Sequence, residues 1–82
     1  MKFLRMRPGF GEQLIAEGDI EVAAEEQALI EQFRLQLDQG MWAAVPVEDG
    51  RSGRREAQMV RHYADIPPEA DRVIFFPRAA GG

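Results

Sequence analysis

The chain has 82 residues, a formal net charge of −4 and no cysteine. A chain of this length forms one domain, and the lack of cysteine excludes disulfides, thiolate metal sites and cysteine nucleophiles. A single histidine cannot build a histidine metal site. No run approaches the roughly 18 apolar residues of a membrane span, and the N-terminus lacks the apolar region of a signal peptide, so we expect a cytoplasmic protein with no membrane partner.

The charges are distributed unevenly along the chain. All charged side chains in residues 1–10 are basic. In residues 11–40 all charged side chains are acidic except that of Arg34. An acidic body argues against nucleic acid as the main partner, because phosphate contacts dominate that affinity. The cluster of Arg51, Arg54 and Arg55 is either a phosphate contact or the solvated face of a loop.

The first predicted elements are two strands joined by a tight turn. Residues 2–7 alternate along a strand, with Phe3 and Arg5 on one side and Leu4 and Met6 on the other. Residues 8–11 carry a proline and two glycines that can adopt positive φ, which is typical of a turn. Residues 12–17 then form the returning strand.

A long helix follows the hairpin. Asp19 is the predicted N-cap, because its carboxylate can accept the free N–H groups of a first helical turn. Gly40 is placed as the glycine that ends the helix, which gives about 20 residues and roughly 30 Å. The apolar positions keep a helical stripe that is interrupted at Glu26; they are Val22, Leu29, Ile30, Phe33 and Leu37.

The second half of the chain contains three further strands. Residues 41–47 form the first, and Pro46 places it near an edge of the sheet, because proline cannot donate to a ladder. Residues 48–53 form a loop, residues 56–63 a weaker strand, and residues 66–71 an irregular segment with at most one short helical turn. The larger apolar residues are expected to fill the core, with any exposed aromatic serving partner docking; they are Met6, Met41, Trp42, Met59, Phe75 and Phe76.

The last strand, residues 72–77, organises the predicted fold. Four large apolar residues in a row, 73–76, indicate a strand buried on both faces, and therefore one in the middle of the sheet beside the first strand. The order ββαβββ predicts an α+β fold of the ubiquitin-like β-grasp type, in which one long helix packs across a mixed sheet of four to five strands. We assign residues 1–77 to this single domain.

Residues 78–82 form a thin tail after Pro77, which ends the last strand. Arg78, Ala79, Ala80, Gly81 and Gly82 carry almost no side-chain bulk beyond the arginine. Frayed termini usually hold mixed polar residues. We interpret the strand as an anchor for a flexible tail whose terminal carboxylate carries the chemistry; the alternative is an inert end.

The segment 71–82 resembles the C-terminus of the ubiquitin-like sulfur carriers, and most of all the small subunit of molybdopterin synthase. The shared features are an acidic residue before the strand, the apolar strand itself, a proline, and small residues leading to Gly81 and Gly82. The chain departs from that pattern at Arg78, where these carriers often have a second proline. The motif covers only about the last dozen residues, and the rest matches in the order of its elements.

This resemblance implies that the chain is a co-substrate and not an enzyme. A ubiquitin-activating-type enzyme would bind ATP, adenylate the Gly82 carboxylate and receive the slim tail formed by Pro77, Arg78, Ala79 and Ala80. The activated carbonyl then takes sulfur, giving a thiocarboxylate for a synthase subunit, or an amine of a target protein. The chain itself binds no cofactor or metal, and its sequence contains no nucleophile–base pair or phosphate-binding loop.

A second hypothesis belongs to a different class. The chain could be a ubiquitin-like interaction module that binds partners through its sheet and never uses its tail. Removal of Gly82 separates the two, because it abolishes the first function and spares the second.

Overall fold

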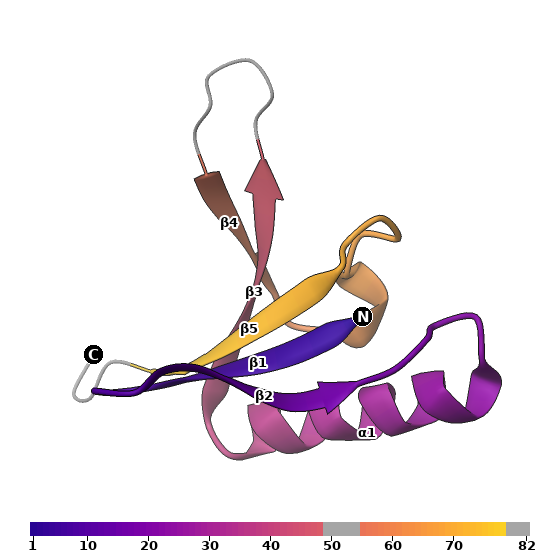
Figure 1. The fold of residues 1–82 in the computed structure, drawn as a ribbon, viewed down its shortest axis with the longest axis horizontal. Coiled ribbons are helices and arrows are strands. Elements are labelled where there is room, and N and C mark those ends of the chain that lie inside the picture. Colours follow the sequence, from indigo (N-terminus) through magenta and orange to yellow (C-terminus); the bar gives the residue numbers. More distant parts are fainter. Residues whose placement is uncertain (49–54, 79–82) are drawn as a thin grey trace.

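The computed structural model describes residues 1–48 and 55–78, and Figure 1 shows their arrangement. The element order along the chain is two strands, a helix, two strands, a short 3-10 helix and a last strand. The bounds are β1 Lys2–Arg7, β2 Gly11–Glu17, α1 Ala23–Asp38, β3 Met41–Glu48, β4 Arg55–Val60, η1 Tyr63–Asp65 and β5 Arg72–Pro77. Among these residues no helix is both long and apolar enough to cross a membrane.

The strands form one mixed five-stranded sheet in the order β2-β1-β5-β3-β4. β5 pairs parallel with β1, whereas the other neighbouring pairs are antiparallel. The prediction that the last strand lies in the middle, beside the first, is therefore confirmed. Because β1 and β5 run in the same direction, the β1–β2 turn and the end of β5 lie at the same end of the molecule (Figure 1).

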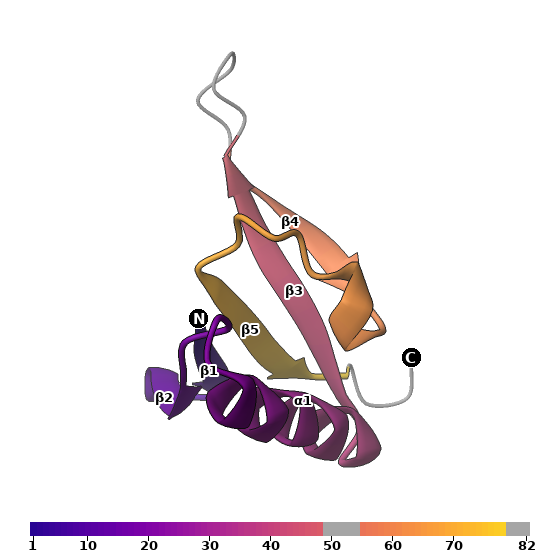
Figure 2. The same ribbon diagram turned by 90° about the vertical axis from the view of Figure 1, so that its right-hand side faces the viewer.

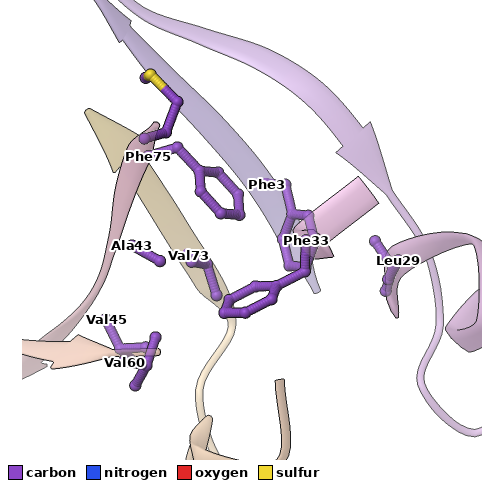
Figure 3. Close-up of a cluster of buried hydrophobic side chains, with 9 residues drawn as sticks. Phe3, Leu29, Phe33, Ala43, Val45, Val60, Val73 and Phe75 are labelled. Carbon is purple, nitrogen blue, oxygen red and sulfur yellow. The ribbon is translucent and has the colours of Figure 1, made fainter. Parts of the chain in front are cut away.

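α1 runs along one face of the sheet, as the α+β prediction requires (Figure 2). The core forms between this helix and the facing side chains of the strands. Three phenylalanine rings from β1, α1 and β5 meet there: the Phe3 and Phe75 centroids are 5.2 Å apart, and that of Phe33 lies 5.7 Å from Phe75 (Figure 3). The buried set is Phe3, Leu29, Phe33, Met41, Ala43, Val45, Val60, Val73 and Phe75.

β5 is buried on one face only, and the prediction of burial on both faces is wrong. Val73 and Phe75 have no exposed surface, whereas the intervening Ile74 and the following Phe76 are half-buried. Side chains of a strand alternate between faces, and one helix covers one face. The other face of the sheet is consequently left with apolar residues at its surface.

The helix begins later than predicted. Its first residue is Ala23, and its N-cap is Val22, which has extended dihedral angles and no side-chain cap. Asp19 uses its carboxylate elsewhere: Oδ1 accepts a hydrogen bond of 2.9 Å from the Glu21 N–H, closing a local turn. The Val22 N–H donates to the Asp19 carbonyl oxygen, so residues 19–22 form a turn before the helix.

The helix end and the hairpin turn agree with the predictions. Gly40 has φ of +85°, in the left-handed region, and its N–H donates to the Leu37 carbonyl oxygen at 3.0 Å. Gly9 and Gly11 also have positive φ, and the Phe10 N–H donates to the Arg7 carbonyl oxygen. α1 has 16 residues, so its length is about 24 Å, shorter than the sequence suggested.

β3 is an internal strand and not an edge strand. Its proline nevertheless lies in a part of β3 that has only one neighbouring strand. Pro46 is opposite Ala57 of β4, which is itself the edge strand. β5 pairs with β3 only from Met41 to Ala44, so β3 extends past β5 at Pro46. The position therefore tolerates a residue without an N–H.

The chain after β4 also differs from the prediction. β4 ends at Val60, and Tyr63–Asp65 form the 3-10 helix η1, so the helical turn precedes the irregular segment instead of lying within it. The Tyr63 ring packs at 81° against Phe33, with centroids 6.1 Å apart. Tyr63 Oη also donates to Glu26 Oε2 at 3.1 Å. Glu26 interrupts the apolar stripe of the helix because it holds this tyrosine.

Candidate functional site

The predicted site residues fall on both sides of the end of β5. Pro77 is the last residue of β5 and lies opposite Met41 of β3, which confirms where the strand ends. Arg78 follows and is exposed. Ala79, Ala80, Gly81 and Gly82, which carry the predicted chemistry, lie outside the described residues. The structure thus places the base of the tail, and the role of the tail stays a prediction.

The face of the sheet opposite α1 carries a continuous row of apolar side chains. Pairing registers align five of them across all five strands, in the order Leu14, Leu4, Ile74, Ala44 and Met59. Trp42 and Phe76 form a second cross-strand pair on this face, with ring centroids 6.3 Å apart, and Met6 follows Leu4 by two residues on β1. We call these eight residues the open face.

Four members of the open face have large exposed fractions: Met6 39%, Trp42 44%, Met59 45% and Leu14 51%. The expectation that Met6, Trp42 and Met59 fill the core is therefore wrong, whereas Met41 and Phe75 are buried. Large apolar patches on a small protein mark interaction sites. Because Trp42 is exposed, the expectation that an exposed aromatic residue serves partner docking applies to it.

Charged residues border the open face. Lys2 and Arg72 are neighbours on β1 and β5, at the end of the sheet away from the tail. Lys2 Nζ lies 3.9 Å from Glu17 Oε2, and Arg72 Nε lies 3.9 Å from Asp71 Oδ1. Both pairs are well exposed and contribute little to stability. An apolar centre with a polar rim is the usual composition of a protein-binding surface.

Trp42 and Arg78 adjoin at the tail end of the open face. The guanidinium carbon of Arg78 lies 5.9 Å from the centroid of the Trp42 ring. Both side chains also line a hollow of about 550 Å³ at this end of the sheet. The other residues that line it come from α1, β3, β4 and the position just after β4; they are Leu37, Met41, Ala43, Met59, Val60 and Arg61.

The helix side of the same end is held by a polar network. Arg5 of β1 donates to Gln36 Oε1 at 3.3 Å and to Gln39 Oε1 at 3.1 Å, and Gln36 Nε2 donates to Gln32 Oε1 at 2.9 Å. Gln36 is buried, so these bonds satisfy an amide that would otherwise be costly. The cation also lies at the C-terminal end of α1, where the helix dipole favours positive charge.

Among the described residues, Tyr63 is the titratable group with a clear shift of its pKa. Burial raises its pKa to about 12, and the hydrogen bond and negative charge of Glu26 act in the same direction, because both disfavour the phenolate. The pair joins η1 to α1, so its role is structural. Within the described parts of the chain, no three His, Cys, Asp or Glu side chains are placed to hold a metal ion.

Neither a family model, nor a curated protein, nor a solved structure matches this chain. The function is therefore inferred from the site itself.

Sequence reasoning allowed for binding through the sheet but missed which apolar residues are exposed on it, although a signal for them was present. β3 and β5 are apolar at successive positions, which indicates two apolar faces, yet the described part of the chain contains a single long helix. One helix covers one face of a sheet. Comparing the two apolar faces with that one helix would have predicted that Trp42 or its neighbours stay exposed.

Proposed function

We propose that this chain is a ubiquitin-like carrier protein with a β-grasp fold, used through the carboxylate of Gly82. One observation carries the proposal: β5, held between β1 and β3 at the centre of the sheet, ends at Pro77 and leads directly into residues 78–82. A strand paired on both sides is fixed in direction. The end of β5, from which the small-residue segment continues, is therefore held at a defined point.

The chemistry proposed for this segment needs a leaving group. A carboxylate is a poor acylating agent, so a Gly82 oxygen first attacks the α-phosphorus of ATP and displaces pyrophosphate. The resulting acyl-adenylate is then attacked at its carbonyl carbon by hydrosulfide or an amine, and AMP and a proton leave. The product is a thiocarboxylate in the first case and an amide conjugate in the second.

A partner enzyme supplies the catalysis in this proposal, as a ubiquitin-activating-type enzyme that binds the ATP. The carrier contributes a segment thin enough to enter the active site of that enzyme, because a site that excludes water admits only a thin chain. Gly81 and Gly82 lack a Cβ and allow close approach of backbone to backbone, and Ala79 and Ala80 add one methyl group each. We place this exchange in the cytoplasm, with a sulfur-accepting synthase subunit or a target protein as the next partner.

The open face is the proposed docking surface for that enzyme. It lies next to the base of the tail, because Phe76 belongs to it and Arg78 begins the tail only two residues later. A partner that covers the face is therefore positioned to receive the tail. Its apolar area would contribute to affinity through burial, with Trp42 and Phe76 as the aromatic anchors expected of a binding hot spot.

The open face also favours a second candidate function. An interaction module would use the same apolar residues to bind a partner and would leave Gly82 unmodified. The two functions share a surface but differ in the covalent fate of the terminus, so the terminus decides between them. Both require exposed apolar residues such as Leu14 and Met59.

The decisive experiment is intact-chain mass spectrometry after incubation with ATP and a candidate activating enzyme. For a carrier we expect a Gly82-linked adenylate, and after addition of a sulfur donor the replacement of one terminal oxygen by sulfur. The chain lacking Gly82 is the matched control, and it should keep the wild-type circular dichroism spectrum while staying unmodified. An unchanged mass with several competent enzymes that nevertheless bind the chain would select the interaction module.

A further inference from the structure

Trp42 is fixed in the sheet by its neighbour on β5. It lies at the start of β3 directly opposite Phe76, and the two rings are tilted at 46° with centroids 6.3 Å apart. One flank of the indole therefore packs on Phe76, while 44% of the residue remains exposed. This leaves an aromatic surface available beside the end of β5.

Arg78 is placed to use that surface. Residues two apart on an extended chain point to the same side, so Arg78 follows Phe76 onto the face that holds Trp42. Its guanidinium carbon is 5.9 Å from the ring centroid, within the range of a cation–π contact. Pro77 between them has a fixed φ, which reduces the directions open to the chain at this point.

We propose that Trp42 is a positioning residue for the C-terminal segment. By holding the Arg78 side chain, it fixes the point at the end of β5 from which the chain continues. Trp42 also belongs to the open face, so a docked partner shields the contact from water. Cation–π contacts strengthen when they are desolvated, and docking would therefore hold the base of the tail more firmly. This inference rests on the proposed carrier function for its activity test, and on the described contact for its structural test.

The structural test uses the free protein and needs no partner. Protons above an aromatic ring are shifted upfield in NMR spectra, so the Arg78 side-chain protons should be shifted in the wild type and unshifted in Trp42→Leu. Trp42→Phe keeps a ring and should restore part of the shift. Trp42 is the only tryptophan of the chain, so Arg78→Gln should also change its fluorescence. Unshifted Arg78 protons in the wild type would overturn the inference, whatever happens at Gly82.

The activity test is a double-mutant cycle on adenylation of Gly82. Arg78→Gln should lower the rate at saturating carrier by about two- to thirtyfold, the range given by exposed and desolvated cation–π contacts, with little change in KM. Arg78→Lys keeps the cation and should recover part of the rate. In a Trp42→Leu background, Arg78→Gln should have almost no further effect, because the contact is already lost.

A matched control shows whether this non-additivity is specific. Leu14→Ala alters the open face on the distant edge strand β2, so its effect should multiply with that of Arg78→Gln. A full Arg78→Gln effect in the Trp42→Leu background would mean that Arg78 contacts the enzyme directly, and would overturn the inference. If the wild type is never adenylated, the proposed function fails, and the NMR spectra alone then confirm or overturn the positioning contact.

Discussion

The aromatic residues divide into two groups according to the face of the sheet that they occupy. Phe3, Phe33 and Phe75 meet between α1 and the sheet and are almost fully buried, whereas Trp42 and Phe76 pair on the open face. Residues next to each other in sequence, such as Phe75 and Phe76, thus have different roles. Burying a phenylalanine contributes about 1.5–3 kcal/mol through the hydrophobic effect, and only the first group gains it in full.

Replacing Phe75 with alanine should be severely destabilising. The ring is fully buried against Phe3 and Phe33, so its loss removes burial and leaves a cavity, at a cost of about 3–5 kcal/mol. Urea unfolding followed by circular dichroism measures the change. Phe10→Ala is the control, because Phe10 is 86% exposed and its loss should cost less than about 0.5 kcal/mol. Equal costs for the two variants would contradict the core described above.

The Tyr63–Glu26 pair predicts a loss of stability at alkaline pH. The pKa of Tyr63 is raised from 10.0 to about 12 in the folded chain, so between these values the folded state holds a proton that the unfolded state releases. The stabilisation is complete below pH 10 and is lost as the pH rises toward 12. Spectrophotometric titration of the phenol and urea unfolding across this range measure it.

Two variants test the origin of that pH dependence. Tyr63→Phe should remove this component of the alkaline slope and cost about 1 kcal/mol at neutral pH, a typical net value for a hydrogen bond. Glu26→Gln keeps an acceptor oxygen but removes the negative charge, so the tyrosine pKa should move back toward its ordinary value. A wild-type titration curve indistinguishable from that of Glu26→Gln would argue against the pair.

The helix illustrates how an element acquires its limits. Its end follows from local chemistry, because Gly40 adopts a positive φ that few other residues accept. Its start also depends on local chemistry, but differs from the prediction. The Asp19 carboxylate accepts a hydrogen bond from the Glu21 N–H within a turn, and the helix begins four residues after Asp19, following an extended Val22. Both termini then fix how Leu29 and Phe33 reach the core.

Gly40→Ala should therefore destabilise the chain by about 1 kcal/mol. No atom lies within 4 Å of the position that a Cβ would take, so the cost comes from backbone strain at φ of +85° and not from a clash. Gly40→Asn should cost less, because asparagine tolerates this conformation. The expected signature is a lower urea midpoint with an unchanged m-value. A neutral alanine variant would show that the turn relaxes to another conformation.

At the scale of the whole molecule, the main feature is a sheet with two apolar faces and one helix. α1 covers the first face, and the open face keeps its apolar side chains, except that of the buried Ala44, at least partly in contact with solvent. The open face borders the base of the tail through Phe76 and Arg78. In the proposed function, one surface therefore both docks the partner and presents the tail to it.

Two exposed leucines allow a matched test of the docking surface. Leu14 on the open face is 51% exposed, and Leu35 on α1 is 48% exposed. Leu14→Glu should weaken binding to the activating enzyme by about tenfold, equivalent to roughly 1.4 kcal/mol, because it places a charge in an apolar interface. Leu35→Glu should leave the affinity unchanged. Calorimetric titration measures both, and equal effects would place the docking surface elsewhere.

Local sequence signals determined much of this fold. Alternation in residues 2–7, the two turn glycines, the helical stripe with Gly40, and the apolar run before Pro77 predicted a hairpin, one helix and a central last strand beside the first. These features depend on short-range backbone preferences and on burial, which are readable from neighbouring residues. The base of the candidate site at Pro77 and Arg78 was also predicted in this way.

Only the tertiary structure decided which apolar residues are covered. Strand alternation assigns Trp42 and Phe76 to one face and Ala43 and Phe75 to the other, but it does not state which face the helix chooses. That choice depends on contacts between residues far apart in sequence, such as Phe33 with Phe3 and Phe75. The same long-range packing recruited Tyr63 to Glu26 and set Arg78 over Trp42, because those pairs form only when separate elements are brought together.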